Sequence, residues 1–109
     1  KIGIIVAMTS ELDCVRSLIE MPGKKEQQAT FYVGSDGKHE IILTQSGIGK
    51  VNAALRAQTL ILNYTPDCII NTGVAGGIDM STRMFDIVIS RETVYHDVWL
   101  GDGNVIGQI

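Results

Sequence analysis

IGIIVA, residues 2–7, opens the chain with a nearly continuous apolar run. A run of this kind lacks the alternation of a half-exposed strand and is typical of a strand buried on both faces, as in a parallel sheet. Thr9 and Ser10 follow, and both residue types are good helix N-caps. The next apolar residues recur at helical spacing until residues 22–23 (PG) break the pattern: Leu12, Val15, Leu18 and Ile19. The chain therefore opens as strand, short turn and helix.

A hairpin is the next element that the sequence predicts. Residues 30–34 (TFYVG) and 40–44 (EIILT) are rich in β-forming residues, and they flank an Asp-Gly pair at residues 36–37. Such a pair between two β-rich runs is a strong hairpin signal.

Beyond the hairpin, a second glycine-bearing turn at residues 45–50 (QSGIGK) precedes a second helix, which ends near residues 63–66 (NYTP). We expect strands at residues 67–71 and 86–90, and loop beyond Tyr95. One face of the second helix is marked by Val51, Ala54, Leu55 and Leu62.

The glycine-rich turn at residues 72–77 (TGVAGG) leaves the strand expected at residues 67–71, which we expect to be buried because residues 68–70 (CII) are apolar. Glycine has no Cβ, so backbone there can approach a small ligand closely, and open α/β sheets bind ligands outside the carboxyl ends of their strands. A tight strand-to-helix connection without a ligand fits the same residues. If their strands are parallel neighbours, the turns at residues 7–11, 46–49 and 72–77 converge on one crevice.

This element order predicts an α/β fold with a mixed, largely parallel central sheet flanked by helices, because the helices fall as crossovers between apolar strands. A chain of 109 residues suits one modest domain with a single core. We therefore expect residues 1–109 to belong to a single domain, with no separate domains.

Composition argues against several partner classes. The net charge is −3 and the charges are dispersed, whereas nucleic-acid binding usually needs a basic stripe. No apolar run approaches the ~20 residues that span a bilayer, and no secretory signal is visible, so we expect a cytoplasmic protein with no membrane partner. Cys14 and Cys68 stand in no metal-ligand or CxxC spacing, and we expect two reduced thiols in the core.

Glu11 is the sharpest candidate for chemistry. It falls in the first turn of the first predicted helix, where the helix dipole favours a carboxylate by about 0.3–1 kcal/mol. A partly buried carboxylate at a ligand-binding edge is what a general base requires. An early Glu after Thr9 and Ser10 is also a common helix start, and spacing alone favours that structural interpretation.

Other chemistry-bearing residues point less clearly to a site. His96 is a ligand, a base or a loop histidine held by Asp97, and a metal site is not expected because no second histidine is near it. Lys50 fails the P-loop spacing, and no dinucleotide-binding glycine fingerprint follows the first strand, so no cofactor is expected. Trp99 covers a pocket, lies in a subunit interface or packs in the core.

Four segments, taken in order, resemble the nucleoside phosphorylase/nucleosidase family. They are residues 1–11 (KIGIIVAMTSE), 46–54 (SGIGKVNAA), 70–77 (INTGVAGG), and 86–90 (DIVIS) with 95–97 (YHD). The resemblance implies a phosphorylase/hydrolase-like fold, a homodimer, and hydrolysis of the N-glycosidic bond of 5′-thio-substituted adenosines, with release of adenine.

The same resemblance implies roles for individual residues. Glu11 would orient and deprotonate the attacking water. The implied substrate-binding residues are Ala7 and Met8 near the ribose and the water, Ile48 at the 5′-alkylthio arm, and Val74, Ala75 and Gly76 as a wall against ribose and base. The loop holding Val98, Trp99 and Leu100 would reach the 5′-thio pocket of the neighbouring subunit.

Several expectations remain open at this stage. In the family, the acid that protonates the base, the glutamate that holds the ribose and the aromatic that stacks on adenine lie in a second half, so this chain resembles an N-terminal half that alone is inactive. Alternatives within the class are a purine or uridine nucleoside phosphorylase and a futalosine-type hydrolase. A non-catalytic nucleoside-binding module is the alternative if the chain ends at Ile109.

Overall fold

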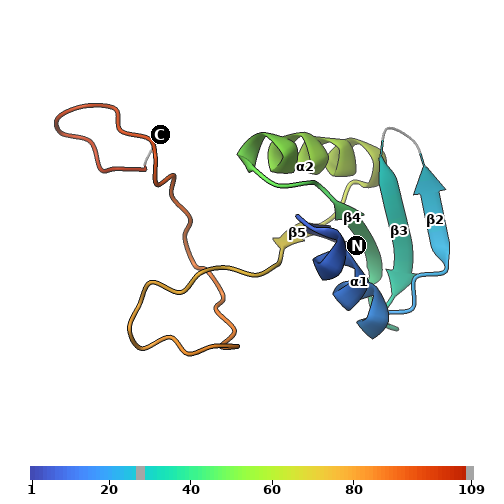
Figure 1. The fold of residues 1–109 in the computed structure, drawn as a ribbon. Helices are drawn as coiled ribbons and strands as arrows, with labels where there is room; N and C mark the ends of the chain where they lie inside the picture. The colour runs from blue at the N-terminus through green and yellow to red at the C-terminus, as the bar shows by residue number, and fades with distance from the viewer. Residues whose placement is uncertain (27–28, 108–109) are drawn as a thin grey trace. The chain divides into compact units, whose positions relative to one another are not determined.

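The computed structural model describes residues 1–26 and 29–107, and it divides the chain into two units, Lys1–Ala75 and Gly76–Ile109. The first unit holds all helices and strands of the described residues (Figure 1). In chain order these are β1 (Ile2–Val6), α1 (Thr9–Leu18), β2 (Gly23–Glu26), β3 (Thr30–Ser35), β4 (Glu40–Gln45), α2 (Lys50–Tyr64) and β5 (Cys68–Asn71).

These strands form one mixed sheet with the order β2-β3-β4-β1-β5. β1 is parallel to both β4 and β5, whereas β2 with β3 and β3 with β4 are antiparallel. The mixed α/β sheet is therefore confirmed, with parallel pairing limited to its β4-β1-β5 side. The sequence analysis missed β2 because its residues, GKKE, have no apolar alternation.

The core consists of two layers, one on each face of the sheet. Side chains alternate along a strand, so Ile4 and Val6 of β1 face α1 while Ile5 faces α2. The α1 layer contains the buried residues Ile4, Val6, Leu12, Ile41 and Leu43. The α2 layer contains Ile5, Phe31, Ile42, Leu60 and Tyr64, with the Phe31 and Tyr64 rings 4.9 Å apart. Both faces of β1 and β4 are thus covered, as the apolar run at residues 2–7 predicted.

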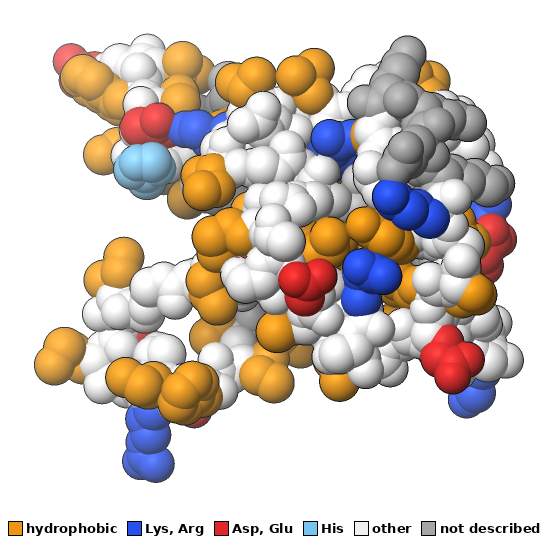
Figure 2. Space-filling view, turned by 45° about the vertical axis from the view of Figure 1, so that its right-hand side comes forward, with side chains coloured by type: hydrophobic (Ala, Val, Ile, Leu, Met, Phe, Trp, Pro, Cys, Tyr) orange, Lys and Arg blue, Asp and Glu red, His pale blue; other side chains and the backbone are white. Residues whose placement is uncertain are grey.

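The face of α2 that packs on the sheet differs from the expected one. Leu60 and Tyr64 are buried and Ala57 packs beside them. The predicted face is exposed in the described structure: Val51, Ala54, Leu55 and Leu62. The prediction was wrong because α2 carries apolar residues on more than one face, so helical spacing did not select the buried one. Figure 2 shows further hydrophobic side chains, in orange, at many places on the visible face of the molecule.

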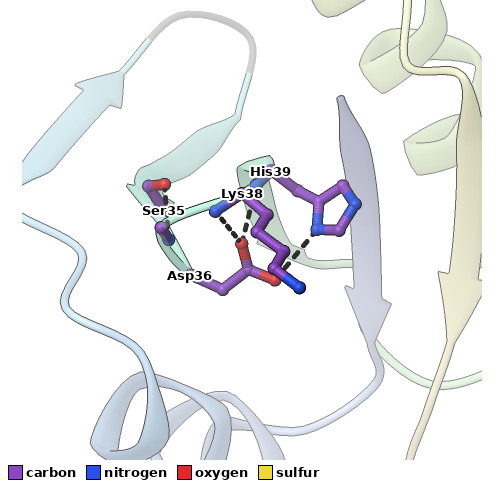
Figure 3. Close-up of polar contacts among 5 residues, drawn as sticks. Ser35, Asp36, Lys38 and His39 are labelled. Carbon is purple, nitrogen blue, oxygen red and sulfur yellow. Dashed lines mark hydrogen bonds and ion pairs between the residues drawn. The ribbon is translucent and has the colours of Figure 1, made fainter.

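The β3–β4 hairpin closes through its own side chains, as the Asp-Gly pair predicted (Figure 3). Asp36 Oδ1 accepts hydrogen bonds from the backbone N–H groups of Lys38 and His39 at 2.9 and 2.7 Å, and Oδ2 lies 3.0 Å from His39 Nδ1. These bonds, led by the His39 side chain, hold the pKa of Asp36 well below its usual range. Ser35 Oγ accepts a further bond from Gly37 N–H at 3.0 Å. The turn fixes the register of β3 against β4.

β5 lies at an edge of the sheet with β1 as its one neighbouring strand. Its residues are exposed, which corrects the expectation of a buried strand at this apolar run. Both cysteines are free, as expected, but neither is buried. Cys68 belongs to this edge strand, and Cys14 lies on α1 away from the buried residue Leu12, so the expected core thiols are at the surface.

The second unit, over its described residues 76–107, contains turns and loops and no helix or strand. The strand expected at residues 86–90 is therefore wrong. An extended segment becomes a strand by pairing with a neighbour, and this segment has no pairing strand in the described structure, with Ile87 and Ile89 91% and 87% exposed. Over the described residues from Tyr95 to Gly107 the chain is loop, as expected, closed by bonds from Tyr95 N–H to Gly107 O and from Gly107 N–H to Val98 O.

Neither α1 nor α2, the helices of the described chain, has the length and apolar character that crossing a bilayer requires.

We predict that Leu60→Ala lowers the free energy of unfolding by about 2–5 kcal/mol, because it empties a fully buried position between α2 and the sheet. Leu62→Ala is the matched control, since Leu62 lies on the same helix and is 70% exposed; its cost should stay within about 0.5 kcal/mol. Urea denaturation of both variants measures the difference. Equal losses at the two positions would show that α2 buries a different face.

Candidate active site

Three chain turns meet at the carboxyl-terminal edge of the sheet, as expected. β4, β1 and β5 are parallel neighbours, and their registers pair Val6 with Gln45 and Ile5 with Asn71. The residues after β4 and β5 are tied to the end of β1: Ser46 N–H donates to Val6 O at 2.8 Å, and Thr72 N–H donates to Ile5 O at 3.1 Å. Parallel pairing therefore brings three chain reversals to one place, the usual location of ligand sites in such sheets.

Glu11 connects two of these turns through its carboxylate. Oε2 accepts hydrogen bonds from the backbone N–H groups of Ala7 and Met8 at 2.9 and 3.0 Å. Oε1 accepts one from Val74 N–H at 3.0 Å, across 63 positions of sequence. Both carboxylate oxygens are thus held by backbone donors: Oε2 by two from the β1–α1 turn and Oε1 by one from the loop after β5.

These donors favour the ionised carboxylate. The Val74 N–H contributes most to lowering the pKa of Glu11 below its ordinary value of 4.5, the Met8 and Ala7 N–H groups act in the same direction, and partial burial opposes them. A carboxylate that accepts several N–H bonds is stabilised in its charged form. At neutral pH Glu11 is therefore an anion with acceptor capacity and no proton of its own.

Glu11 also begins the helix, so the structural interpretation of its position is correct as well. α1 starts at Thr9 with Met8 as its N-cap, and Glu11 reaches back to the Met8 N–H in the manner of a capping box. The expected N-caps, Thr9 and Ser10, lie instead in the first turn of α1. The N-cap is Met8, and its backbone N–H donates to the Glu11 carboxylate. The bond to Val74 N–H is not explained by helix capping, since it ties the helix start to a distant loop.

A cavity of about 370 Å³ lies beside the Glu11 carboxylate. Its walls come from the end of β1, the first turns of α1 and the loop after β5: Val6, Ser10, Glu11, Cys14, Val15, Thr72, Gly73 and Val74. The apolar lining and one anionic group suit a small uncharged or cationic ligand better than an anion.

The turn after β4 supplies the third side of this edge. Gly47 and Gly49 have φ angles of 87° and 101°, values that favour glycine, and Gly49 is the N-cap of α2. Ile48 between them is 73% exposed, and its carbonyl accepts a bond from Asn52 Nδ2 at 2.7 Å. No described contact joins Ile48 to Glu11, so the two share an edge of the sheet without touching.

The structure brings part of the predicted set together. Glu11, Ala7, Met8 and Val74 are joined by hydrogen bonds, and Ala75 ends the same unit. Of the other predicted residues, Ile48 lies in the first unit without a contact to Glu11, and the rest belong to the second unit: Gly76, Val98, Trp99 and Leu100.

Gln45 was missed by the sequence analysis. Its Nε2 donates to Ala7 O and its Oε1 accepts from Thr9 Oγ1, each at 3.4 Å. Its contacts depend on the register of β4 against β1, so no local signal in the sequence could have found it.

His96 lies in the second unit, 89% exposed, with Nδ1 3.8 Å from Asp97 Oδ1. This is the loop histidine beside Asp97, one of the three alternatives that the sequence left open. Over residues 1–26 and 29–107 the structure shows no group of three or more His, Cys, Asp or Glu side chains placed to hold a metal ion.

Comparison with known proteins finds similar nucleosidases both by sequence and by fold. The chain is 48% identical over 99 residues to the 5′-methylthioadenosine/S-adenosylhomocysteine nucleosidase of Tolumonas auensis, covering 90% of this chain and 43% of that protein. It is 43% identical over 110 residues to the Pseudoalteromonas translucida protein of the same name, covering 99% and 47%. The chain thus spans less than half the length of these curated relatives.

Solved structures agree with the sequence relatives. The Streptococcus pneumoniae MTA/SAH nucleosidase in complex with 8-aminoadenine superposes with a TM-score of 0.91 at 35% identity, covering all of this chain and 49% of that chain. The Colwellia psychrerythraea nucleosidase in complex with adenine gives 0.91 at 41% identity, covering 99% and 46%. The family described as the phosphorylase superfamily matches residues 1–103, and the chain therefore belongs to that superfamily.

Proposed function

We propose that the protein hydrolyses the N-glycosidic bond of 5′-methylthioadenosine and S-adenosylhomocysteine and releases adenine. The names of its relatives support this activity. The observation that carries the proposal is the Glu11 carboxylate, which three backbone N–H groups hold at the carboxyl edge of the sheet, beside a cavity.

In this proposal Glu11 acts as the general base. Water attacks the anomeric carbon of the ribose, a C–O bond forms, and the bond from that carbon to the adenine nitrogen breaks. The water proton passes to the Glu11 carboxylate, and the bonding electron pair leaves with adenine, which a separate acid protonates. A base must be unprotonated to act. A glutamate is already ionised at neutral pH, and the hydrogen bonds that lower the pKa of Glu11 keep it ionised in more acidic solution as well. We expect the separate acid to lie outside the residues that this chain spans, as the resemblance to the family implies.

The other predicted residues take positions around this base in the proposal. Ala7 and Met8, whose N–H groups touch Glu11, lie near the ribose and the water. Ile48 contacts the 5′-alkylthio arm, for which its exposed apolar side chain is suited. Val74, Ala75 and Gly76 form a wall against ribose and base.

Water rather than phosphate is the proposed nucleophile, for three reasons. Val74 offers no hydroxyl at the loop after β5. An anionic Glu11 in the same cavity repels an incoming phosphate, because like charges at short range in a partly buried site are unfavourable. Arg16 is engaged elsewhere, with its guanidinium 4.3 Å from the centre of the Tyr32 ring.

We predict that Glu11→Gln lowers kcat for 5′-methylthioadenosine by at least ~10²-fold, because the amide cannot accept the water proton. Adenine release by the protein as its gene encodes it, with and without phosphate, is the measurement. Asp13→Asn is the matched control, since it removes one negative charge from an exposed position on the same helix; its kcat should stay within about twofold.

Two results would contradict this proposal. A Glu11→Gln rate close to that of the unaltered protein would remove Glu11 from the mechanism. Adenine release that depends strictly on phosphate would instead support a nucleoside phosphorylase.

The pH profile provides a second test. Because the pKa of Glu11 is lowered, its carboxylate stays ionised as pH falls through the ordinary carboxyl range. We predict that kcat/KM shows no loss assignable to Glu11 between about pH 8 and pH 5. The opposite result is a loss of kcat/KM toward low pH in that range, seen in the unaltered protein and in Asp13→Asn but not in Glu11→Gln. Such a loss would show that the base has a raised pKa.

We further propose a homodimer in which Val98, Trp99 and Leu100 of one subunit reach the 5′-thio pocket of the other. Their apolar character supports this role, with Trp99 and Leu100 61% and 56% exposed. A cytoplasmic location remains a prediction from the sequence.

Trp99→Ala tests the loop. We predict a rise in KM for 5′-methylthioadenosine of about tenfold, equivalent to about 1.4 kcal/mol of lost binding. The KM for adenosine should change less, because its 5′-hydroxyl lacks the alkylthio group. Steady-state kinetics with both nucleosides, together with light scattering for the dimer, make the measurement. Equal effects on the two substrates would place Trp99 outside the 5′ pocket.

A further inference from the structure

We propose that Gly73 is a positioning residue for Glu11: the space that a side chain at position 73 would occupy is filled by the Glu11 carboxylate. This inference rests on the proposed function, in which Glu11 is the base. It concerns a residue that contacts Glu11 and acts through it.

The distances carry the inference. A Cβ on Gly73 would lie 2.5 Å from Glu11 Oε1, 2.9 Å from Cδ and 3.2 Å from Oε2. Favourable carbon–oxygen contacts begin near about 3.3 Å. All three atoms of the carboxyl group therefore stand within the space of the missing side chain, and Oε1 in its observed place is incompatible with any residue but glycine at position 73.

Space rather than backbone conformation sets this requirement. Gly73 is not among the glycines with a positive φ, so alanine can adopt its backbone conformation. The obstacle is the far end of the flexible Glu11 side chain, which can turn away while the backbone keeps its place. The next residue, Val74, donates the N–H that Oε1 accepts, so a displaced carboxylate loses the bond between α1 and the loop after β5.

Gly34 offers a useful contrast. A Cβ there would collide with the backbone carbonyl oxygen of Glu20, which cannot turn away. Substitution at Gly34 is expected to reduce stability, whereas substitution at Gly73 is expected to move a carboxylate and leave the fold intact. Gly34 is thus required by the packing of the fold, whereas Gly73 is required by the position of the Glu11 carboxylate.

The experiment compares Gly73→Ala, Glu11→Gln and the double variant in the protein as its gene encodes it. We expect Gly73→Ala to lower kcat for 5′-methylthioadenosine by about 10²-fold, the loss typical of a catalytic group displaced by about 1 Å. The KM should stay within about threefold. The thermal midpoint should fall less than in Gly34→Ala, because Gly73→Ala removes only hydrogen bonds of a displaced side chain, whereas a Cβ at Gly34 collides with backbone. The double variant should be no slower than Glu11→Gln, because residues that act through one group are not additive.

Each other outcome is decisive. If Gly73→Ala keeps its kcat while Glu11→Gln loses activity, the positioning role is overturned and the proposed function stands. If Gly73→Ala and Glu11→Gln multiply in the double variant, Gly73 acts independently of Glu11 and the inference fails. If Glu11→Gln keeps its rate, the proposed function fails, and any loss in Gly73→Ala has another cause.

Discussion

Parallel pairing of β1 with both β4 and β5 is the constraint on which the rest of the structure depends. It sets three strand ends side by side, so that turns from distant parts of the sequence share one edge. An antiparallel neighbour on either side of β1 would send one of these turns to the opposite edge. The apolar residues of β1 make this arrangement stable because both faces of the strand are covered, one by α1 and the other by α2.

Glu11 uses this arrangement for two purposes at once. Its bond to the Met8 N–H satisfies an amide at the start of α1, and its bond to the Val74 N–H fastens the loop after β5. A helix cap needs an acceptor, and a general base needs an unprotonated carboxylate, so the same hydrogen bonds serve both. The structural and the catalytic interpretations of this residue are therefore compatible, and the bond across 63 positions is what distinguishes it from an ordinary cap.

Local signals in the sequence were sufficient for much of this fold. The apolar run of β1, the Asp-Gly pair of the hairpin and the helical spacing of α1 each predicted the right element, and adjacent parallel strands predicted the convergence of the turns. Signals that depend on tertiary neighbours failed. Three features were not predicted: the exposed face of α2, the edge position of β5 and the absence of a strand at residues 86–90 in the described structure. Each depends on which element the segment packs against or pairs with. An apolar run in the sequence does not say which element that is. At the site, Glu11 and its loop were predictable, whereas Gln45 was not, because its role comes from the register of β4 against β1.

The outer side of β5 has one more implication. Among the described residues its amides and carbonyls on the side away from β1 have no neighbouring strand, and the residues Ile69 and Ile70 are 36% and 47% exposed. An apolar edge strand of this kind is a template for adding another strand, from the same chain or from a different molecule. Purified protein in which this edge strand is unpaired will tend to aggregate. It is therefore best kept in dilute solution or together with a polypeptide that pairs with β5.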